Sequence, residues 1–424
     1  MVKTRYELVE GNASAFAGLF AVSEFLRKIK FDGLFRENFG DLRRVREFRA
    51  VDNLKMLMAV VLSGGERLYD VERLKSDRVL PELFGNGSVP HSTTIRGDLL
   101  KFGCLDLERE EFLFRLNEKL LYFVKPKIII IDIDGTATPV EGHQEGAEKG
   151  YCPASPGSRC FQHLIATWDE MKTTLAIETR PGNTHCVNGA IEFIRKVLDR
   201  FSHQVDKIIV RCDAGFYSDE ILEALEAYEN VEYEVSGAKL KHRVGQLDES
   251  CFKSYHNSES EYATFYYRMN NGKLRTYYVE RTPSNKPQMA LYHELEFSYR
   301  VIVSNREGKQ PHKIFAEYNA RGRQEKEICE LKNEFALGRI VGHDFELTKA
   351  GGWLSALCHT IIGMFRWVAF RKEYRRYQMR RLRFFLFSIV GKFVKHANQK
   401  ILKLHIPHMG KWRYNKMLER ISLC

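Results

Sequence analysis

The sequence predicts an α/β protein, because residues 126–239 alternate between apolar strand-like runs and amphipathic helical segments. The expected elements are, in chain order, strands at 128–135, 161–168 and 173–178, a helix at 190–201, a strand at 207–212, a helix at 218–228 and a strand at 231–235. Strand, strand, strand, helix, strand, helix, strand is the element order of a ribonuclease H-like core. We therefore expect residues 126–239 to form the first part of such a core.

The segment before this core is expected to be helical. Apolar residues recur at helical spacing through Phe16–Ile29 and again through Leu54–Val61. Ser92 or Thr93 is a candidate cap for a short helix, which is either a plain packing helix or the second helix of a helix-turn-helix. Residues 1–125 are therefore assigned to a helical N-terminal region.

Residues 240–310 interrupt the alternation with β-type runs rich in tyrosine and valine, at 265–267, 275–279 and 299–303. The Asn270-Asn-Gly turn separates the first two of these runs. We interpret 240–310 as a β-rich insertion. Helical patterning then returns, so 311–345 is expected to hold the last core helix and 346–424 a basic helical C-terminal region.

The positive charge of the chain is concentrated at its C-terminal end. The 424 residues carry a net charge of +11, whereas the segment from Arg366 onward has 16 Lys/Arg against Glu373 and Glu419, a net +14. Residues 1–365 are therefore net −3. Aromatic residues are interleaved with these cations, which suits a polyanion, although a solvated helical face is the alternative.

The cysteine pattern and the hydropathy of the chain indicate in which cellular compartment the protein is expected. The nine cysteines include no Cys-x-x-Cys pair, and the spacing of Cys152, Cys160 and His163 matches no standard zinc-ligand pattern. The most apolar stretch, 354–370, contains His359 and Arg366 and falls short of a membrane span. We expect a cytoplasmic protein with reduced thiols and no membrane partner.

Two aspartates come at the predicted end of the first strand, in Asp132-Ile-Asp134-Gly-Thr136. Residues two apart in a strand share a face, so both carboxylates are expected to point the same way and to suit a hard cation. A third carboxylate, Asp213, follows the apolar strand at 207–212 and precedes a helix. The alternative for each is an aspartate that is solvated at a strand end or shapes a turn.

The most specific pattern is Tyr-x2-Arg-x3-Glu-x6-Lys at 318–332. At ~100° per residue, Tyr318, Arg321, Glu325 and Lys332 fall within an arc of roughly 60° if one helix spans them all. A glutamate flanked on its own face by phosphate-binding side chains could hold a metal while its neighbours grip a phosphate backbone. A solvated charged helical face is the alternative.

These motifs together resemble those of DDE insertion-sequence transposases, whose last motif carries this Tyr-Arg-Glu-Lys signature. The resemblance covers roughly 125–345 and rests on Asp134-Gly-Thr136, on Asp213 and on the run at 318–332. The loop Gly150-Tyr-Cys-Pro153 resembles the branch with a Gly-Tyr-Asn-Pro element after the first aspartate, with Cys152 in place of Asn. The β-rich segment resembles the β insertion of the family.

The resemblance implies that Asp134, Asp213 and Glu325 form a metal-binding catalytic triad for two Mg²⁺ ions, which Mn²⁺ could replace. Asp132 is the fallback for the first carboxylate. The resemblance also implies cleavage at transposon ends to a 3′-hydroxyl, which then attacks target DNA. It remains open whether a hairpin intermediate lies between the two steps.

The implied partner is double-stranded DNA, both the terminal inverted repeats and the target. Tyr318, Arg321 and Lys332 are expected to contact its phosphates, residues 1–125 to bind DNA, and a homodimer to form in the synapse. Tyr266, Tyr267 and Tyr278 are candidates for stacking a flipped base, with ordinary sheet packing as the alternative. The resemblance further implies a prokaryotic, nucleoid-associated protein.

Two other functions are compatible with these motifs. One is a transposase-derived DNA-binding protein that no longer cuts, against which the complete triad argues. The other is a different ribonuclease H-like nuclease, acting for instance on RNA–DNA hybrids. That alternative would not explain the Tyr318, Arg321 and Lys332 pattern or the large insertion.

Overall fold

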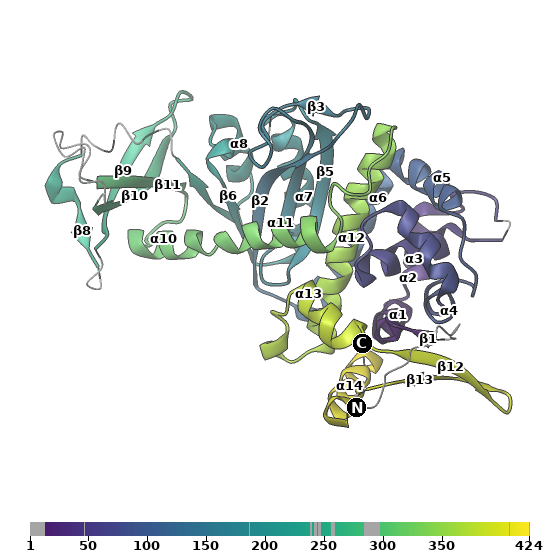
Figure 1. Ribbon diagram of the computed structural model, residues 1–424. Coiled ribbons are helices and arrows are strands. Elements are labelled where there is room, and N and C mark those ends of the chain that lie inside the picture. The colour runs from purple at the N-terminus through teal and green to yellow at the C-terminus, as the bar shows by residue number, and fades with distance from the viewer. Residues whose placement is uncertain are drawn as a thin grey trace, which may run out of the picture. The chain divides into compact units, whose positions relative to one another are not determined.

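The protein is described here by a computed structural model covering residues 13–45, 47–185, 187–237, 240, 244, 247–255, 259–283, 297–406 and 408–423 (Figure 1). The chain divides into two compact units. One unit comprises Leu113–Cys329, and the other joins Met1–Phe112 to Glu330–Cys424. The helices α6 (Asp106–Val124) and α11 (Gly322–Glu334) each run from one unit into the other.

The unit Leu113–Cys329 is built on one mixed sheet, whose core has the strand order β5-β4-β2-β6-β7. Strands β2, β6 and β7 are parallel, whereas β4 runs antiparallel to both β2 and β5. The elements of this core are β2 (Ile128–Pro139), β4 (Arg159–Trp168), β5 (Thr173–Pro181), α7 (Ala190–Phe201), β6 (Lys207–Cys212), α8 (Asp219–Glu226) and β7 (Val231–Ser236). This is the element order predicted from the sequence, with boundaries that shift by a few residues.

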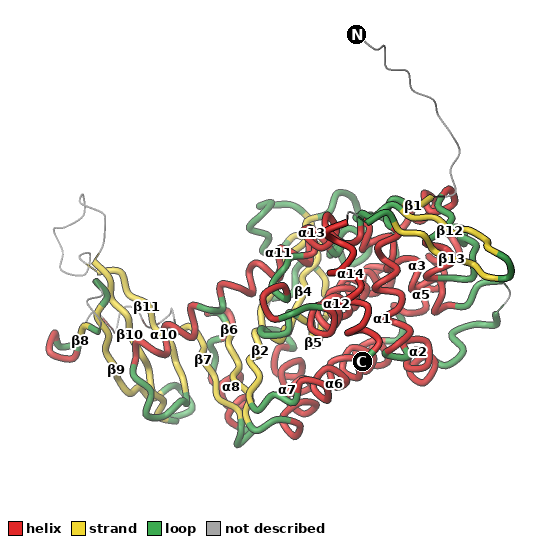
Figure 2. The backbone as a smooth tube through the Cα atoms, turned by 90° about the horizontal axis from the view of Figure 1, so that it is seen from below, coloured by secondary structure: helices red, strands yellow, loops and turns green. Residues whose placement is uncertain are grey.

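The predicted β insertion extends the core sheet (Figure 2). Strand β11 (Phe297–Ser304) pairs antiparallel with β7, and β10 (Leu274–Pro283), β9 (Glu261–Arg268) and β8 (Lys253–Ser254) follow outward. The short β3 (Glu148–Lys149) lies on β4 at the other side. The turn from β9 to β10 uses Gly272 at a φ of +77°, a backbone conformation that favours glycine.

Two expectations for this unit were wrong in detail. Strand β2 does not end at Gly135 but continues to Pro139, because β4 still pairs with it after β6 has ended. The run at 318–332 is not one helix: α10 (Pro311–Asn319) stops before Ala320 and Arg321, and α11 begins at Gly322. Gly322, a residue type with the lowest helix propensity after proline, directly follows this interruption between the two helices.

The second unit is mainly helical and packs around α12 (Phe345–Ala369), which is buried along most of its length. Helix α5 packs against α12, and Phe39 and Phe102 meet Trp353 at ring distances of 5.8 and 5.5 Å. Its other helices are α1 (Phe20–Lys28), α2 (Phe31–Phe39), α3 (Ala50–Ser63), α4 (Leu80–Phe84), α5 (Ser92–Gly103), α13 (Met379–Leu382) and α14 (His408–Ser422). Within the described residues, no helix combines the length and apolarity needed to cross a bilayer.

Two local expectations in this unit also need correction. The cap of α5 is His91, whose Nδ1 accepts a hydrogen bond from the Thr93 amide, and not Ser92 or Thr93. The C-terminal region, expected to be helical, contains a hairpin of β12 (Gly391–His396) and β13 (Gln399–Leu404), with β1 (Ala13–Ser14) as third strand.

Candidate active site

The first two predicted carboxylates lie at the point where β2 and β6 separate. These parallel strands pair up to Ile133 and Cys212, so Asp134 and Asp213 are the next residues on neighbouring strands. Each carboxylate is oriented by a nearby amide: Gly135 N donates to Asp134 at 2.8 Å, and Gly215 N donates to Asp213 at 2.9 Å. The register of the sheet therefore brings together two residues that are far apart in the sequence.

The third carboxylate, Glu325, comes from the first turn of α11 and is exposed. The negative charge of Glu325 acts on the Asp134 carboxyl. Burial raises the pKa of the Asp134 carboxyl to about 6, and the Arg321 guanidinium opposes this shift. The negative charges of Asp213 and Glu325 are smaller contributions to that raised pKa. The three predicted residues thus share one electrostatic environment within the unit Leu113–Cys329.

Arg321 lies in the same environment and contacts the first aspartate. Its Nη2 is 2.9 Å from Asp134 Oδ2, and both side chains are mostly buried. Burial lowers the pKa of Arg321, but the charges around it, with that of Asp134 the largest, together outweigh burial and raise the pKa overall. Nε and Nη2 of Arg321 make no hydrogen bond of good geometry with any described residue. Arg321 is therefore a cation with unused donors beside the carboxylates.

The donor set suits a hard divalent cation, since it consists of carboxylate oxygens. Among the described residues, however, no three His, Cys, Asp or Glu side chains are close enough to hold a metal ion as they stand. Arg321 supplies the positive charge next to Asp134. The chemistry of the residues fits a metal site, whereas ligation would require the carboxylates to draw closer together.

Asp132, the fallback for the first position, is committed elsewhere. Its two carboxylate oxygens accept from Nε and Nη2 of Arg211 at 2.5 and 2.7 Å, and both side chains are almost fully buried. Arg211 also donates to Asp169 and to the Glu317 carbonyl. Asp132 therefore belongs to a buried ion-pair network, and Asp134 is the carboxylate left for the site.

That network includes residues whose role the sequence analysis did not identify. Asp169 accepts from both Arg211 and Arg323, the latter from the first turn of α11, at 3.0 and 2.6 Å. The network ties α11 to the core sheet two residues before Glu325. The signal in the sequence was an arginine inside the apolar run Ile208-Ile-Val-Arg-Cys212, because a buried charge requires a buried partner.

Tyr318 and Lys332 occupy different settings. The Tyr318 hydroxyl donates to the Cys212 carbonyl at 3.0 Å, and burial raises its pKa to about 12. This bond attaches the end of α10 to the residue before Asp213. Lys332 follows Glu325 by seven residues on α11, close to two turns, so the two side chains project to similar sides of the helix. Phosphate contacts by Tyr318, Arg321 and Lys332 stay predictions.

The candidate stacking residues of the insertion differ in exposure. Tyr278 is buried and donates to the Arg306 carbonyl at 3.0 Å, which fits sheet packing. Tyr267 packs edge-on against Tyr277, with ring centroids 5.9 Å apart. Tyr266 is 68% exposed and is the candidate still open to a ligand.

The cysteine and histidine group near the Gly150–Pro153 loop shows no sign of a zinc site. Cys152 and Cys160 are buried together with Ala137. Both ring nitrogens of His163 have hydroxyl partners, with Nε2 2.9 Å from Thr138 Oγ1 and Nδ1 3.0 Å from Thr179 Oγ1. These side chains belong to the sheet core.

The chain matches the model of one protein family and is similar to a solved transposase structure. The family model described as "Transposase DDE domain group 1" matches residues 7–424. No curated protein sequence matches the chain. Among solved structures, the piggyBac transposase in a synaptic complex with hairpin DNA is similar at 12% identity and a TM-score of 0.44. That likeness covers 88% of this chain and 80% of the other.

Proposed function

Because this chain belongs to the family of transposases with a DDE domain, we propose that it cleaves transposon ends and transfers them into target DNA. The observation that carries the proposal is the convergence of Asp134, Asp213 and Glu325, from two neighbouring strands and one helix, into one electrostatic environment. We assign catalysis to these three residues. The core that holds them is proposed to be ribonuclease H-like, which the strand order β5-β4-β2-β6-β7 supports.

The three carboxylates would hold two divalent cations, Mg²⁺ with Mn²⁺ as a substitute. Two such metal ions would activate a water or a 3′-hydroxyl at neutral pH and would stabilise the leaving oxygen of a phosphodiester. The raised pKa of Asp134, which burial causes and the charges of Asp213 and Glu325 reinforce, supports this assignment, since a bound cation would stabilise the ionised carboxylate. The protein contributes the orientation of the carboxylates, through the amides of Gly135 and Gly215 and the buried network around Asp132.

Arg321 has a role that its unused donors suggest. In the structure it neutralises Asp134, and its Nε and Nη2 lack well-placed acceptors. We infer that Arg321 releases Asp134 when DNA is engaged and grips a backbone phosphate beside the scissile one, for which a guanidinium is well shaped. Lys332, two turns beyond Glu325, would contact a second phosphate, and Tyr318 would hold this segment against β6.

The substrate is accordingly double-stranded DNA, namely the terminal inverted repeats of the element and a target duplex. Residues 1–125 and the basic region from 346 onward are proposed to bind that DNA, and a homodimer is proposed to pair two ends. We further propose a prokaryotic protein that is cytoplasmic and associated with the nucleoid.

A cleavage assay tests the proposal. The substrate is a plasmid that carries the DNA flanking the protein's own gene, incubated with the full chain and Mg²⁺ or Mn²⁺. Asp134→Asn, Asp213→Asn and Glu325→Gln should each abolish strand cleavage while binding to the flanking DNA persists. Glu220→Gln, an exposed carboxylate on α8, is the matched control and should cleave like the wild type.

Two results would overturn the assignment. Cleavage by any of the three variants at the wild-type rate would remove that residue from the catalytic group. Absence of cleavage by the wild type with either metal, together with intact DNA binding, would favour the inactive DNA-binding relative instead.

A further inference from the structure

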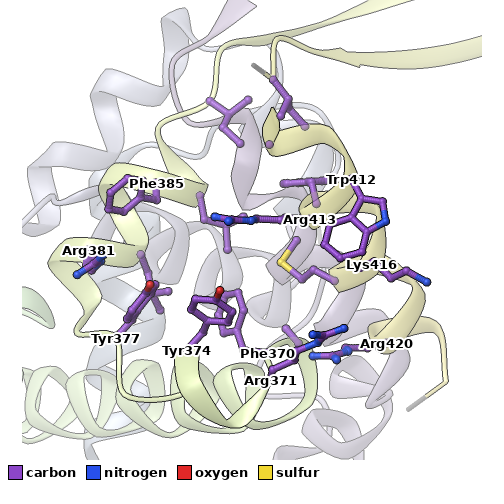
Figure 3. Close-up of a pocket in the computed structure, with 18 residues that line it drawn as sticks. Phe370, Arg371, Tyr374, Tyr377, Arg381, Phe385, Trp412, Arg413, Lys416 and Arg420 are labelled. Atoms are coloured by element: carbon purple, nitrogen blue, oxygen red, sulfur yellow. The ribbon is translucent and has the colours of Figure 1, made fainter. Parts of the chain in front are cut away.

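The C-terminal region contains a pocket that the proposed catalytic site does not use. It has a volume of about 560 Å³, within the range of roughly 300–1,000 Å³ typical of ligand pockets. All of its lining residues lie in the second unit, between the end of α12 and α14. Its lining, drawn in Figure 3, comprises Ala369, Phe370, Arg371, Tyr374, Tyr377, Arg381, Leu382, Phe385, Leu386, Ile389, Ile406, Gly410, Trp412, Arg413, Tyr414, Lys416, Met417 and Arg420.

The charge of this lining has one sign. It contains four arginines and one lysine, and none of the lining residues is acidic. Arg371, Arg413 and Arg420 form no ion pair with any described carboxylate, and Figure 3 shows the Arg413 side chain reaching from α14 into the pocket. Burial and the nearby charge of the lining residue Arg420 lower the pKa of Arg375, which follows the lining residue Tyr374 in the chain. This surplus of cations favours an anionic occupant.

The second property of the lining is aromatic surface that remains accessible. Trp412 is 60% exposed and Phe385 is 61% exposed, and Tyr374 is also exposed. The Arg381 guanidinium lies over the Tyr377 ring at 4.2 Å and 5.2 Å from the Phe385 centroid, which orients it along the aromatic wall. Single exposed rings are common on protein surfaces, whereas several exposed rings lining one pocket are a mark of a binding site.

We propose that this C-terminal pocket binds an unpaired nucleotide of a single-stranded DNA segment, with its base stacked on an exposed ring and its phosphates held by the cations. Cations combined with aromatic stacking surfaces are the usual composition of sites for single-stranded nucleic acid. Phosphates of a duplex require only exposed cations, because its bases are already stacked on one another. The proposal rests on the proposed function in one respect, that DNA is the ligand.

Binding of matched DNA probes to the full chain tests this, in EDTA so that no cleavage occurs. The probes are a fluorescein-labelled duplex with a short thymidine overhang and a blunt duplex of the same paired sequence. The wild type should prefer the overhang. Trp412→Ala combined with Arg413→Gln should weaken overhang binding by about tenfold, since one stacked base contributes ~1–3 kcal/mol. The affinity for the blunt duplex should fall much less, by the contribution of one arginine of the basic region alone.

Matched controls come from the neighbouring positions. Phe384 is as exposed as Phe385, and Lys411 is an exposed cation beside Trp412, but neither lines the pocket. Phe384→Ala combined with Lys411→Ala should keep the preference for the overhang. Equal losses on both probes in the pocket variant, equal losses in the control variant, or no overhang preference in the wild type would each overturn the proposal.

Tryptophan fluorescence gives an independent readout. Trp168 and Trp353 are buried, and Trp367 is half-buried with the Arg375 guanidinium over its ring, so quenching by a stacked base should arise mainly at the exposed Trp412. The overhang probe should quench the wild type, and Trp412→Phe should lose that quenching while it still binds. Asp134→Asn should show the overhang preference of the wild type, so loss of cleavage and loss of nucleotide binding can be told apart. Quenching that survives in Trp412→Phe would contradict the pocket as the binding site.

Discussion

Asp132 and Asp134 are two residues apart on β2, and the structure gives them opposite roles, which makes their substitution to asparagine informative. Asp132 is bonded through both oxygens to the buried Arg211. Asp134 lies in the candidate active site, among carboxylates of the same sign. Asp132→Asn should therefore reduce stability. Asp134→Asn should remove cleavage and change stability much less, because burial already disfavours the ionised Asp134 carboxylate and its pairing with Arg321 offsets only part of that cost.

The magnitude for Asp132→Asn follows from its surroundings. Removing one partner of a buried ion pair costs about 3–5 kcal/mol, because the other charge remains buried. Arg211 retains Asp169 and the Glu317 carbonyl, so the loss should lie near the lower value, about 3 kcal/mol. For a unit of this size, ~2–4 °C in melting temperature accompanies each kcal/mol, which gives a decrease of roughly 6–12 °C.

Thermal unfolding followed by circular dichroism, with urea titration as a second measure, tests this pair of variants. The two should separate clearly, with the midpoint lowered in Asp132→Asn alone. A wild-type midpoint for Asp132→Asn would refute the reasoning about the buried network. A comparable decrease in Asp134→Asn would show that this carboxylate is structural too.

Three further results are expected. Lys332→Ala should weaken binding to duplex DNA and reduce the slope of log affinity against log salt by about one unit, measured by titration at several salt concentrations. Tyr318→Phe loses the hydrogen bond to the Cys212 carbonyl and should lower the free energy of unfolding by ~1 kcal/mol. It should also reduce cleavage, because Asp213 directly follows Cys212. An unchanged free energy of unfolding together with an unchanged cleavage rate would contradict the anchoring role. Burial raises the pKa of the Glu234 carboxyl to about 7, against the opposing charge of Arg306. The protonated Glu234 therefore stabilises the fold fully at a pH below the pKa of glutamate in the unfolded chain, and this stabilisation is lost as the pH rises through 7. The wild type should lose stability between about pH 4.5 and 7 relative to Glu234→Gln in urea titrations, and parallel pH profiles would contradict the shift.

Much of the core fold was predictable because its strands are buried on both faces. Continuous apolar runs such as 207–212 have sharp ends, and the structure places β6 at those same residues. The end of β2 was less clear, since it depends on pairing with β4, a partner distant in the sequence. The C-terminal hairpin was not predicted because its strands lack the alternation of period two: Lys392 and Lys395, like Lys400 and Lys403, are three residues apart.

The candidate site was predictable only in its residue types. Strand position indicated Asp134 and Asp213, and the spacing at 318–332 indicated Glu325, but the helical wheel assumed a continuous helix that breaks at Ala320. The contact of Arg321 with Asp134 depends on that break and on tertiary packing, which local periodicity does not encode. The motif favoured Asp134 over Asp132, but the reason that Asp132 is not available, its bonds to the buried Arg211, is not visible in the sequence.

The central claim is that three distant carboxylates bind the same metal ions, and Mn²⁺ binding measured by electron paramagnetic resonance tests it most directly. With a duplex of its own flanking DNA present, the wild type and Glu220→Gln should bind Mn²⁺ alike, whereas Asp134→Asn, Asp213→Asn and Glu325→Gln should each lose most of that binding. Undiminished Mn²⁺ binding in all three variants would contradict the assignment of the site.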